Sequence, residues 1–186
     1  KDEDIYQGVP IGGYTHIIER MITDTPVELN VDFNKDKEYW LSKAKRVVYT
    51  GAIDELFNYK LGALDYRSLR FNHERIDVED YQGNAIVNHT EETIPFTRII
   101  EHKHFECINS NHTIISQEFP DNWSIGKEKY YPINNDDNNK LHKQYVDVIK
   151  KEYPNFILGG RLACYKYFDM HQVIGQALKK FEEQCY

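Results

Sequence analysis

Residues 159–170 read Gly-Gly-Arg-Leu-Ala-Cys-Tyr-Lys-Tyr-Phe-Asp-Met and separate a predicted strand from a predicted helix. The preceding run, Phe156-Ile157-Leu158, is short and apolar, which is typical of a buried strand. Asp169 suits the N-cap of the helix because its carboxylate can accept a hydrogen bond from a free backbone N–H. Apolar residues at the spacing of one helical face predict the helix itself: Met170, Val173, Ile174, Ala177, Leu178 and Phe181.

This unit of strand, glycine turn, arginine and capped helix favours a ligand site. Glycines let a backbone approach a ligand closely, and Arg161 lies directly after them. A helix N-terminus carries about half a positive charge and commonly faces an anion or an electron-rich ligand edge. A plain strand-to-helix connection is the alternative, and a lone Gly-Gly-Arg does not decide between the two.

The composition limits the classes of function. The chain of 186 residues suits one domain, or one domain and part of another. Its net charge of -7 argues against a nucleic-acid surface, which would be basic. An anionic ligand would therefore be held by a few local arginines. The 14 tyrosines suit sugar and phosphate ligands as well as ordinary packing.

The cysteines and the hydropathy indicate a reducing, cytoplasmic setting. Cys107, Cys164 and Cys185 are odd in number and widely spaced, which fits neither a disulfide framework nor a zinc site. The sequence shows no span long and apolar enough for a membrane helix and no signal peptide. The chain begins at Lys1 in what reads as mid-sequence, so we expect a processed or trimmed polypeptide.

The pattern predicts an α+β fold. Helices or strands of an α/β unit are predicted at 14–21, 27–33, 47–51, 54–61, 141–149, 156–158 and 170–181, with a charged surface turn at 35–45. Between them, strands are predicted at 66–71, 76–78, 85–90, 96–105 and 113–117, and short links make their sheet antiparallel. We predict an α/β unit split by an inserted sheet, with divisions at 1–63, 64–133 and 134–186. The expected opening strand and phosphate-binding loop are not in the sequence, so part of the α/β domain is missing.

Arginines at unusual places are the first candidate site residues. Arg67 and Arg98 lie in predicted strands, and Arg161 lies in the glycine turn. An arginine within a strand faces solvent, a carboxylate or an anionic ligand. Asp65 and Glu101 are available partners, so structural ion pairs are the alternative. A charge-assisted hydrogen bond contributes roughly 1.5–3 kcal/mol, so two arginines could anchor a diphosphate.

Aromatic and histidine residues give weaker signals. In Tyr130-Tyr131-Pro132 the proline favours an extended backbone, so one tyrosine could pack while the other faces a cleft. His102 and His104 are expected on one strand face with Arg98, and with Glu106 they resemble a metal set. We expect no metal there, because the arginine would repel a cation. No nucleophile elbow or activated cysteine is found.

Seven motifs together resemble the bacterial UDP-galactopyranose mutases. They occur in order and cover nearly all of the chain: YQGVPIGGYT (6–15), YTGAID (49–54), YRSLRF (66–71), DYQGNA (80–85), FTRIIEHK (96–103), YYPI (130–133) and GRLACYKYFDM (160–170). The resemblance covers only the C-terminal half of such an enzyme. It implies that residues 1–63 and 134–186 belong to an FAD-binding domain and that residues 64–133 form an inserted substrate domain.

The resemblance implies a flavin-dependent isomerase. Such enzymes interconvert UDP-galactopyranose and UDP-galactofuranose, the precursor of cell-surface polysaccharide, by attack of the reduced FAD N5 on the anomeric carbon. It implies Arg98 and Arg67 as catalytic residues. It implies substrate binding by Arg98, Arg67, Tyr131, Tyr167 and Tyr6. It implies FAD binding by Gly160, Arg161, Tyr167, Asp169 and Met170.

The missing half limits the expected activity. Without the phosphate-binding loop, we expect FAD affinity to be lost and the 186-residue chain to be inactive alone. Expected partners are UDP-galactose and, in a homodimer, a second copy. Two alternatives stay open: a non-catalytic, β-rich nucleotide- or carbohydrate-binding module, and another flavin enzyme of the amine-oxidase type.

Overall fold

The computed structural model describes residues 5–6 and 8–185, so Lys1 and residue 7 of the first motif lie outside it. The chain divides into two compact units. The first joins the residues up to Asn30 with Leu69–Pro120, and the second joins Val31–Ser68 with the residues from Asp121 onward. The fold is α+β, as predicted, while the predicted domain limits stay a prediction.

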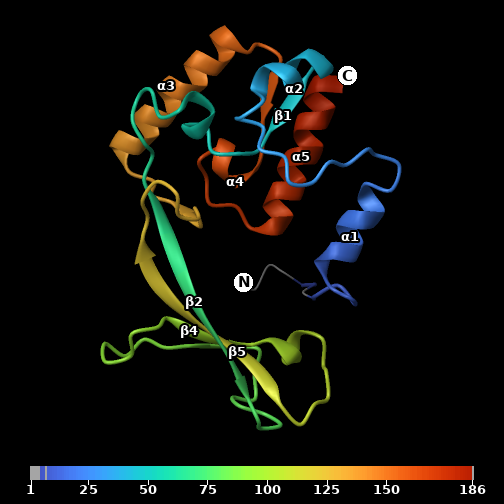
Figure 1. The fold of residues 1–186 in the computed structure, drawn as a ribbon, viewed down its shortest axis with the longest axis vertical. Coiled ribbons are helices and arrows are strands. Elements are labelled where there is room, and N and C mark those ends of the chain that lie inside the picture. Colours follow the sequence, from blue (N-terminus) through green and yellow to red (C-terminus); the bar gives the residue numbers. More distant parts are fainter. Residues whose placement is uncertain (1–4, 7, 186) are drawn as a thin grey trace. The chain divides into compact units, whose positions relative to one another are not determined.

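A two-stranded parallel sheet lies at the centre of the second unit (Figure 1). Strand β1 (Val47–Tyr49) pairs with β7 (Phe156–Leu158), and both lie where the sequence predicted buried strands. One face of the sheet packs on the core through Tyr49 and Phe156, whose rings lie 6.2 Å apart. The helices of this unit are α2 (Lys37–Lys43), η1 (Glu55–Phe57), α3 (Asp136–Glu152), α4 (Gly160–Ala163) and α5 (Met170–Cys185).

Buried aromatic side chains hold this core together. Tyr145 of α3 stacks on Phe57 at 5.8 Å, and its hydroxyl donates to the carbonyl of Gly62 at 2.7 Å. Helix α3 begins as a capped, amphipathic helix should, because the Asn135 side chain accepts a hydrogen bond from the N–H of Asn138 at 2.8 Å. The predicted helical face at 141–149 is therefore confirmed.

The antiparallel sheet lies in the middle of the chain, as predicted, but the separate strands predicted at 66–71 and 76–78 are wrong, because one continuous strand runs through both to Ile76 and residues 77–78 form no strand. Its hydrogen-bonded order is β3-β4-β5-β2-β6. The bounds are β2 (Tyr66–Ile76), β3 (Ile86–Asn88), β4 (Arg98–Glu101), β5 (Thr113–Asn122) and β6 (Tyr131–Pro132). The first unit also holds α1 (Tyr14–Met21), which matches its prediction, and η2 (His102–Phe105).

The predicted strand at 27–33 is wrong. Residues 27–33 form no strand, and Val27 and Leu29 are exposed. Asn30 has a φ of 59°, which breaks an extended backbone. Alternation alone cannot make a strand without a neighbouring strand to bond. Phe33 at its end instead packs on Tyr49, with ring centroids 5.8 Å apart.

The surface turn predicted at 35–45 contains helix α2. Its charges fit a helix, because Glu38 lies in the first turn and Lys43 in the last. Lys37 is not simply solvated, since its Nζ donates to the carbonyl of Leu56 at 2.7 Å. The helix predicted at 54–61 is shorter than expected, because Asn58 takes a φ of 49° directly after η1.

The strand predicted at 96–105 also ends early. Strand β4 stops at Glu101, which is opposite Ile115 of β5, and the chain then turns into η2. His102 and His104 therefore do not share a strand face with Arg98, and that expectation is wrong. Among the described residues, none of the helices has the length and apolar character needed to cross a membrane.

Candidate active site

Two tyrosine rings and a guanidinium group meet in the second unit. Tyr131 of β6 stacks on Tyr167 with ring centroids 5.4 Å apart and an angle of 26° between the rings. The Arg161 guanidinium lies 4.6 Å from the Tyr167 ring centroid and 5.7 Å from that of Tyr131. Three residues predicted for the site are thus brought together from β6, α4 and the loop before α5.

Arg161 is held by backbone carbonyls. Its Nε and Nη2 both donate to the carbonyl of Phe168, with Nε at 3.2 Å, and its Nη1 donates to the carbonyl of Tyr130 at 3.1 Å. The side chain therefore joins the loop before α5 to β6. This arrangement positions Tyr167, which is 54% exposed, against Tyr131.

Arg67 lies beside this group in the strand register. It pairs directly with Tyr131 across the β2–β6 ladder, and the N–H of Tyr130 donates to its carbonyl at 3.1 Å. Arg67 is exposed, whereas its neighbours Tyr66 and Ser68 are buried. Directly opposed residues of an antiparallel pair project to the same face, so the side chains of Arg67 and Tyr131 share one face of the sheet.

The connection into α5 follows the predicted order. Gly160 has a φ of +74°, a conformation that favours glycine, and begins the single turn of α4. Helix α5 begins directly after Asp169, whose N–H donates to the Gln172 side chain at 2.8 Å. This contact is one half of a capping box. Met170 is exposed at the first helical position.

Arg98 and Tyr6 belong to the first unit. Arg98 lies opposite Glu118 in the β4–β5 register, and its Nε is 3.3 Å from the Glu118 Oε1. Glu118 is buried and also accepts a hydrogen bond from the Thr97 hydroxyl at 2.9 Å. Glu118, and not Glu101, is thus the carboxylate partner of Arg98. Tyr6 is almost fully exposed. Convergence of Arg98 with Tyr131 and Tyr167 stays a prediction.

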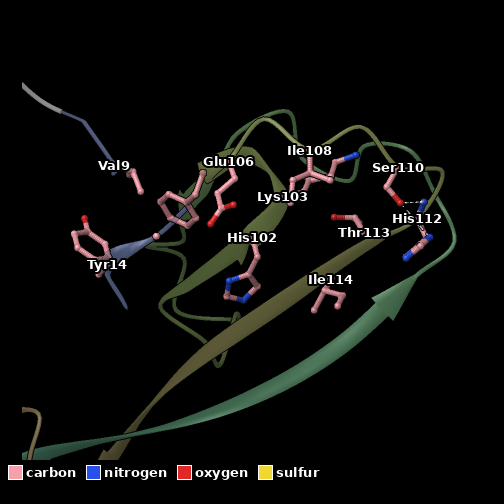
Figure 2. Close-up of a pocket in the computed structure, with 12 residues that line it drawn as sticks. Val9, Tyr14, His102, Lys103, Glu106, Ile108, Ser110, His112, Thr113 and Ile114 are labelled. Carbon is pink, nitrogen blue, oxygen red and sulfur yellow. Dashed lines mark hydrogen bonds between the residues drawn. The ribbon is translucent and has the colours of Figure 1, made fainter. Parts of the chain in front are cut away.

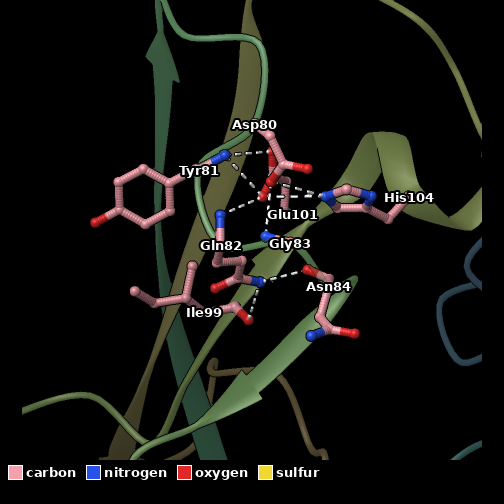
Figure 3. Close-up of polar contacts among 8 residues, drawn as sticks. All are labelled: Asp80, Tyr81, Gln82, Gly83, Asn84, Ile99, Glu101 and His104. Atoms are coloured by element: carbon pink, nitrogen blue, oxygen red, sulfur yellow. Dashed lines mark hydrogen bonds and ion pairs between the residues drawn. The ribbon is translucent and has the colours of Figure 1, made fainter.

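The sequence did not predict a cluster around the buried Glu101 carboxylate in the first unit, which also includes His104 and the exposed Asp80 (Figure 3). Glu101 is fully buried and accepts hydrogen bonds from the N–H groups of Tyr81 and Gln82, the latter at 3.0 Å. His104 Nε2 lies 3.3 Å from Glu101 Oε2 and 3.4 Å from Asp80 Oδ1. Asp80 in turn accepts from the N–H of Gly83 at 2.6 Å.

These contacts make the cluster a clamp on the 80–83 turn. Its imidazole and two carboxylates are of the type that binds metals, and their ligand atoms lie within 4.8 Å of one another. Backbone N–H groups of the turn already donate to both carboxylates, so the main role of the carboxylates is to hold the turn. Burial alone would raise the pKa of Glu101, but the nearby Thr113 hydroxyl and the N–H groups of Tyr81 and Gln82 together lower it.

Two histidines, His73 and His102, contact the hydroxyl of buried Ser116. Its Oγ lies 2.6 Å from His73 Nδ1 and 2.6 Å from His102 Nε2. Burial, followed by the neighbouring His73, lowers the pKa of His102. Close-up views place His102 at a cavity of about 570 Å³ in the first unit, lined also by Tyr14 of α1 and by residues from η2 and β5 (Figure 2). Residues of the motifs at 6–15 and 96–103 line it, among them Tyr14 and His102, although the sequence analysis assigned neither residue to a cavity.

Comparison with known proteins decides the family. The family described as UDP-galactopyranose mutase matches residues 3–167 of the chain. The chain belongs to this family. It is 37% identical to the UDP-galactopyranose mutase of Mycoplasma pneumoniae over 193 residues, which cover 95% of this chain and 48% of the relative. The Mycoplasma genitalium UDP-galactopyranose mutase is also 37% identical, over 198 residues, with 96% of this chain and 48% of the relative covered.

The mutase family includes more than one named activity among these relatives. A dTDP-fucopyranose mutase of Escherichia coli is 30% identical over 180 residues, covering 94% of this chain and 48% of that protein. The chain thus spans about half the length of the curated mutases that it matches. All seven motifs lie within residues 3–170, so the family match contains nearly every residue of the candidate site.

Proposed function

We propose that this chain forms the C-terminal half of a flavin-dependent UDP-galactopyranose mutase. The observation that carries the proposal is the family match over residues 3–167, within which Arg67, Tyr131, Tyr167 and Arg161 lie on adjoining elements of one unit. The reaction would interconvert the pyranose and furanose forms of the sugar in a UDP-linked galactose, without net redox change.

The protein's own groups would hold the diphosphate. Arg98 and Tyr131 are proposed to bind it, with Arg67, Tyr167 and Tyr6 lining the substrate site. Glu118 contacts Arg98 through Nε, and the Nη groups of the same guanidinium would donate to phosphate oxygens, a pairing that suits the planar arginine fork. Fixed cationic donors would stabilise the diphosphate as it leaves the anomeric carbon.

The residues around the α5 N-terminus fit a flavin. Exposed Tyr167 and Met170 offer flat and apolar surface there, and the first N–H groups of α5 favour an electron-rich ring edge. Gly160, Asp169 and Arg161 would complete the contact, with Arg161 acting through the backbone carbonyls that it holds. When bound, the reduced flavin supplies the nucleophile for the anomeric carbon.

The dTDP-fucopyranose mutase relative gives a specific second candidate. Its substrate differs from UDP-galactose in the nucleoside, by both base and ribose, and in the transferred sugar, while the diphosphate is shared. The arginine and tyrosine groups described here would serve either diphosphate equally. Choice between the two substrates would therefore depend on groups that contact the base and the sugar C6 position.

The test is an activity assay on a joined protein. This chain is fused after the N-terminal half of the M. pneumoniae mutase, and conversion of UDP-galactofuranose is followed by HPLC with dithionite. We expect conversion by the joined protein and none by the 186-residue chain alone. A joined protein that binds flavin but converts neither UDP- nor dTDP-linked sugars would overturn the proposal and favour another flavin enzyme. One that binds UDP but no flavin would favour a binding module.

A further inference from the structure

The open cavity of about 570 Å³ in the first unit has no part in the proposed function (Figure 2). Its walls come from the segment that leads into α1, from η2 and the loop after it, and from the start of β5. Figure 2 shows Val9 and Tyr14 at one end, Ser110 and His112 at the other, and Glu106 between them. In the described part of the chain, none of the residues that line the cavity belongs to the candidate active site. Small-molecule pockets commonly have volumes of roughly 300–1,000 Å³, so this cavity has the size of a ligand site.

Aromatic and aliphatic side chains form much of the cavity wall. The rings of Tyr14 and Phe105 are 45% and 38% exposed, so both leave part of their surface to a ligand. Val9, Ile108 and Ile114 add aliphatic surface, and all three are exposed as well. Flat apolar surfaces of this kind pack against the C–H faces of sugar rings, and a tyrosine hydroxyl can form a hydrogen bond at the same time.

The charged groups at the cavity balance one another. Glu106 brings one carboxylate, and Lys103 brings one ammonium group. A cation would be repelled by Lys103 and an anion by Glu106, so neither sign of charge is favoured in a ligand. Hydroxyl groups come from Thr113 and from Ser110, whose Oγ lies 3.1 Å from His112 Nδ1. This set of groups favours a neutral ligand that carries several hydroxyl groups.

The imidazole of His102 also borders the cavity. Its Nε2 lies 2.6 Å from Ser116 Oγ, so a hydrogen bond to a ligand would be made by Nδ1. Partial burial, and then the neighbouring His73, lower the pKa of His102, so the ring is neutral near pH 7. A neutral imidazole has one donor and one acceptor nitrogen. It therefore suits a hydroxyl group, which both donates and accepts, and it leaves the balance of charge unchanged.

We propose that this cavity binds a neutral saccharide of one or two sugar rings. The side chains of Tyr14 and Phe105 pack against the apolar faces of the sugar. The Glu106 carboxylate accepts from sugar hydroxyl groups, which makes the strongest single contact because the acceptor is charged. His102 and Thr113 complete the contacts to hydroxyl groups. The site goes beyond the proposed function, because it uses residues outside the proposed active site and requires neither a flavin nor a nucleotide.

The experiment is a titration of the isotope-labelled 186-residue chain with lactose, followed by the shifts of its amide signals in NMR spectra. Lactose is the neutral saccharide probe, and choline and inorganic phosphate are the cationic and anionic probes. The test variants are Glu106→Gln and Phe105→Ala. The matched controls, Glu92→Gln and Phe181→Ala, make the same exchanges at exposed positions outside the cavity.

We expect lactose to cause saturable shifts at the amides of residues 102–114, and choline and phosphate to cause none. Both test variants should weaken lactose binding at least about tenfold, the scale of one lost charge-assisted hydrogen bond or one lost ring contact. Both controls should bind lactose as the unaltered chain does. The amide spectra also show whether each variant is folded, and Glu106→Gln decides the outcome if Phe105→Ala does not fold.

Several results would overturn the proposal. Absence of lactose shifts, or equal lactose binding by Glu106→Gln, would exclude the site. Stronger binding of choline or phosphate would show that the cavity takes a charged ligand instead. Displacement of lactose by excess UDP would assign the sugar to the proposed active site. Loss of the lactose shifts in the protein joined to the M. pneumoniae half would show that the other half fills the cavity. Failure of the joined protein to convert UDP-galactofuranose leaves this test unaffected, because lactose binding is measured without flavin.

Discussion

The Arg161 guanidinium lies 4.6 Å from the centroid of the Tyr167 ring while it donates to the carbonyl of the next residue, Phe168. One side chain therefore fixes both the ring and the backbone of the loop that leads into α5. A second donation, to Tyr130, extends this hold to β6. Arg161 is thus better described as a positioning residue than as a ligand.

Replacing Arg161 should destabilise the second unit. Arg161→Ala removes the bonds to two carbonyls and the ring contact, and we expect unfolding free energy to fall by about 2–4 kcal/mol. Arg161→Lys keeps the charge but cannot reproduce the planar fork, so we expect a loss of about 1–2 kcal/mol. Urea unfolding measures both, with exposed Lys140→Ala as the control. Equal stability of all three variants would show that Arg161 does not hold the loop.

Glu101 should stabilise the first unit above acidic pH. Glu101→Gln exchanges a fully buried acceptor for an amide whose NH2 faces the backbone donors of Tyr81 or Gln82. We expect a loss of about 1–3 kcal/mol at pH 7. Exposed Glu92→Gln is the control, and chemical denaturation followed by fluorescence is the measurement.

The same carboxyl should give a defined pH dependence. Because hydrogen bonds outweigh burial and lower its pKa from the ordinary 4.5, the stabilisation is complete above about pH 4.5 and is lost as pH falls through the lower native value. We expect the difference in stability between the protein and Glu101→Gln to shrink between pH 5 and pH 2, on the order of these reference values. A difference that grows on acidification would contradict this assignment.

The cap of α3 gives a local test of the second unit. The Asn135 side chain accepts from the N–H of Asn138, and Asn135→Ala removes that acceptor. We expect a loss of about 1 kcal/mol in unfolding free energy. Asn135→Asp, which keeps an acceptor at the N-cap, should stay close to the original stability in the same denaturation experiment.

Arg98 provides the functional prediction. In the joined protein described above, Arg98→Ala should lower kcat/KM by roughly 10²–10³-fold, the scale for loss of one charged donor at a developing anion. Arg75→Ala is the control, because this exposed arginine pairs only loosely with Asp77 at 3.3 Å. Steady-state HPLC kinetics measure both variants. Retention of full activity by Arg98→Ala would remove it from the diphosphate site.

Periodicity identified the elements whose apolar faces pack or could pack on a partner. The helix within α3 was predicted because one face is apolar, and that face buries Tyr145 and Ile149. The strand at β7 was predicted from its continuous apolar run. The helix at 14–21 was predicted from its periodicity, although none of its residues is buried. The incorrect predictions fall where the local sequence pattern does not decide the backbone structure. Residues 27–33 alternate well, yet Asn30 breaks the strand, and α2 was hidden by its charges.

Side-chain partners in the site could not be read from the chain alone. Glu118 becomes the partner of Arg98 only through the β4–β5 register, and that register depends on where β4 ends. The prediction that this strand continues to residue 105 wrongly placed His102 and His104 on a strand face. The turn held by Glu101 was invisible for the same reason, since Tyr81 and Gln82 precede Glu101 by about twenty residues.

The hydroxyl of buried Tyr165 donates to the carbonyls of Asp65 and Ile133, at the bases of β2 and β6. Arg67 and Tyr131 pair with each other two residues further along these strands. The Tyr165 hydroxyl, which lies outside the candidate site, therefore helps to fix the register of that pair. A change at Tyr165 should therefore disturb the alignment of Arg67 with Tyr131, although Tyr165 is not itself one of the candidate site residues.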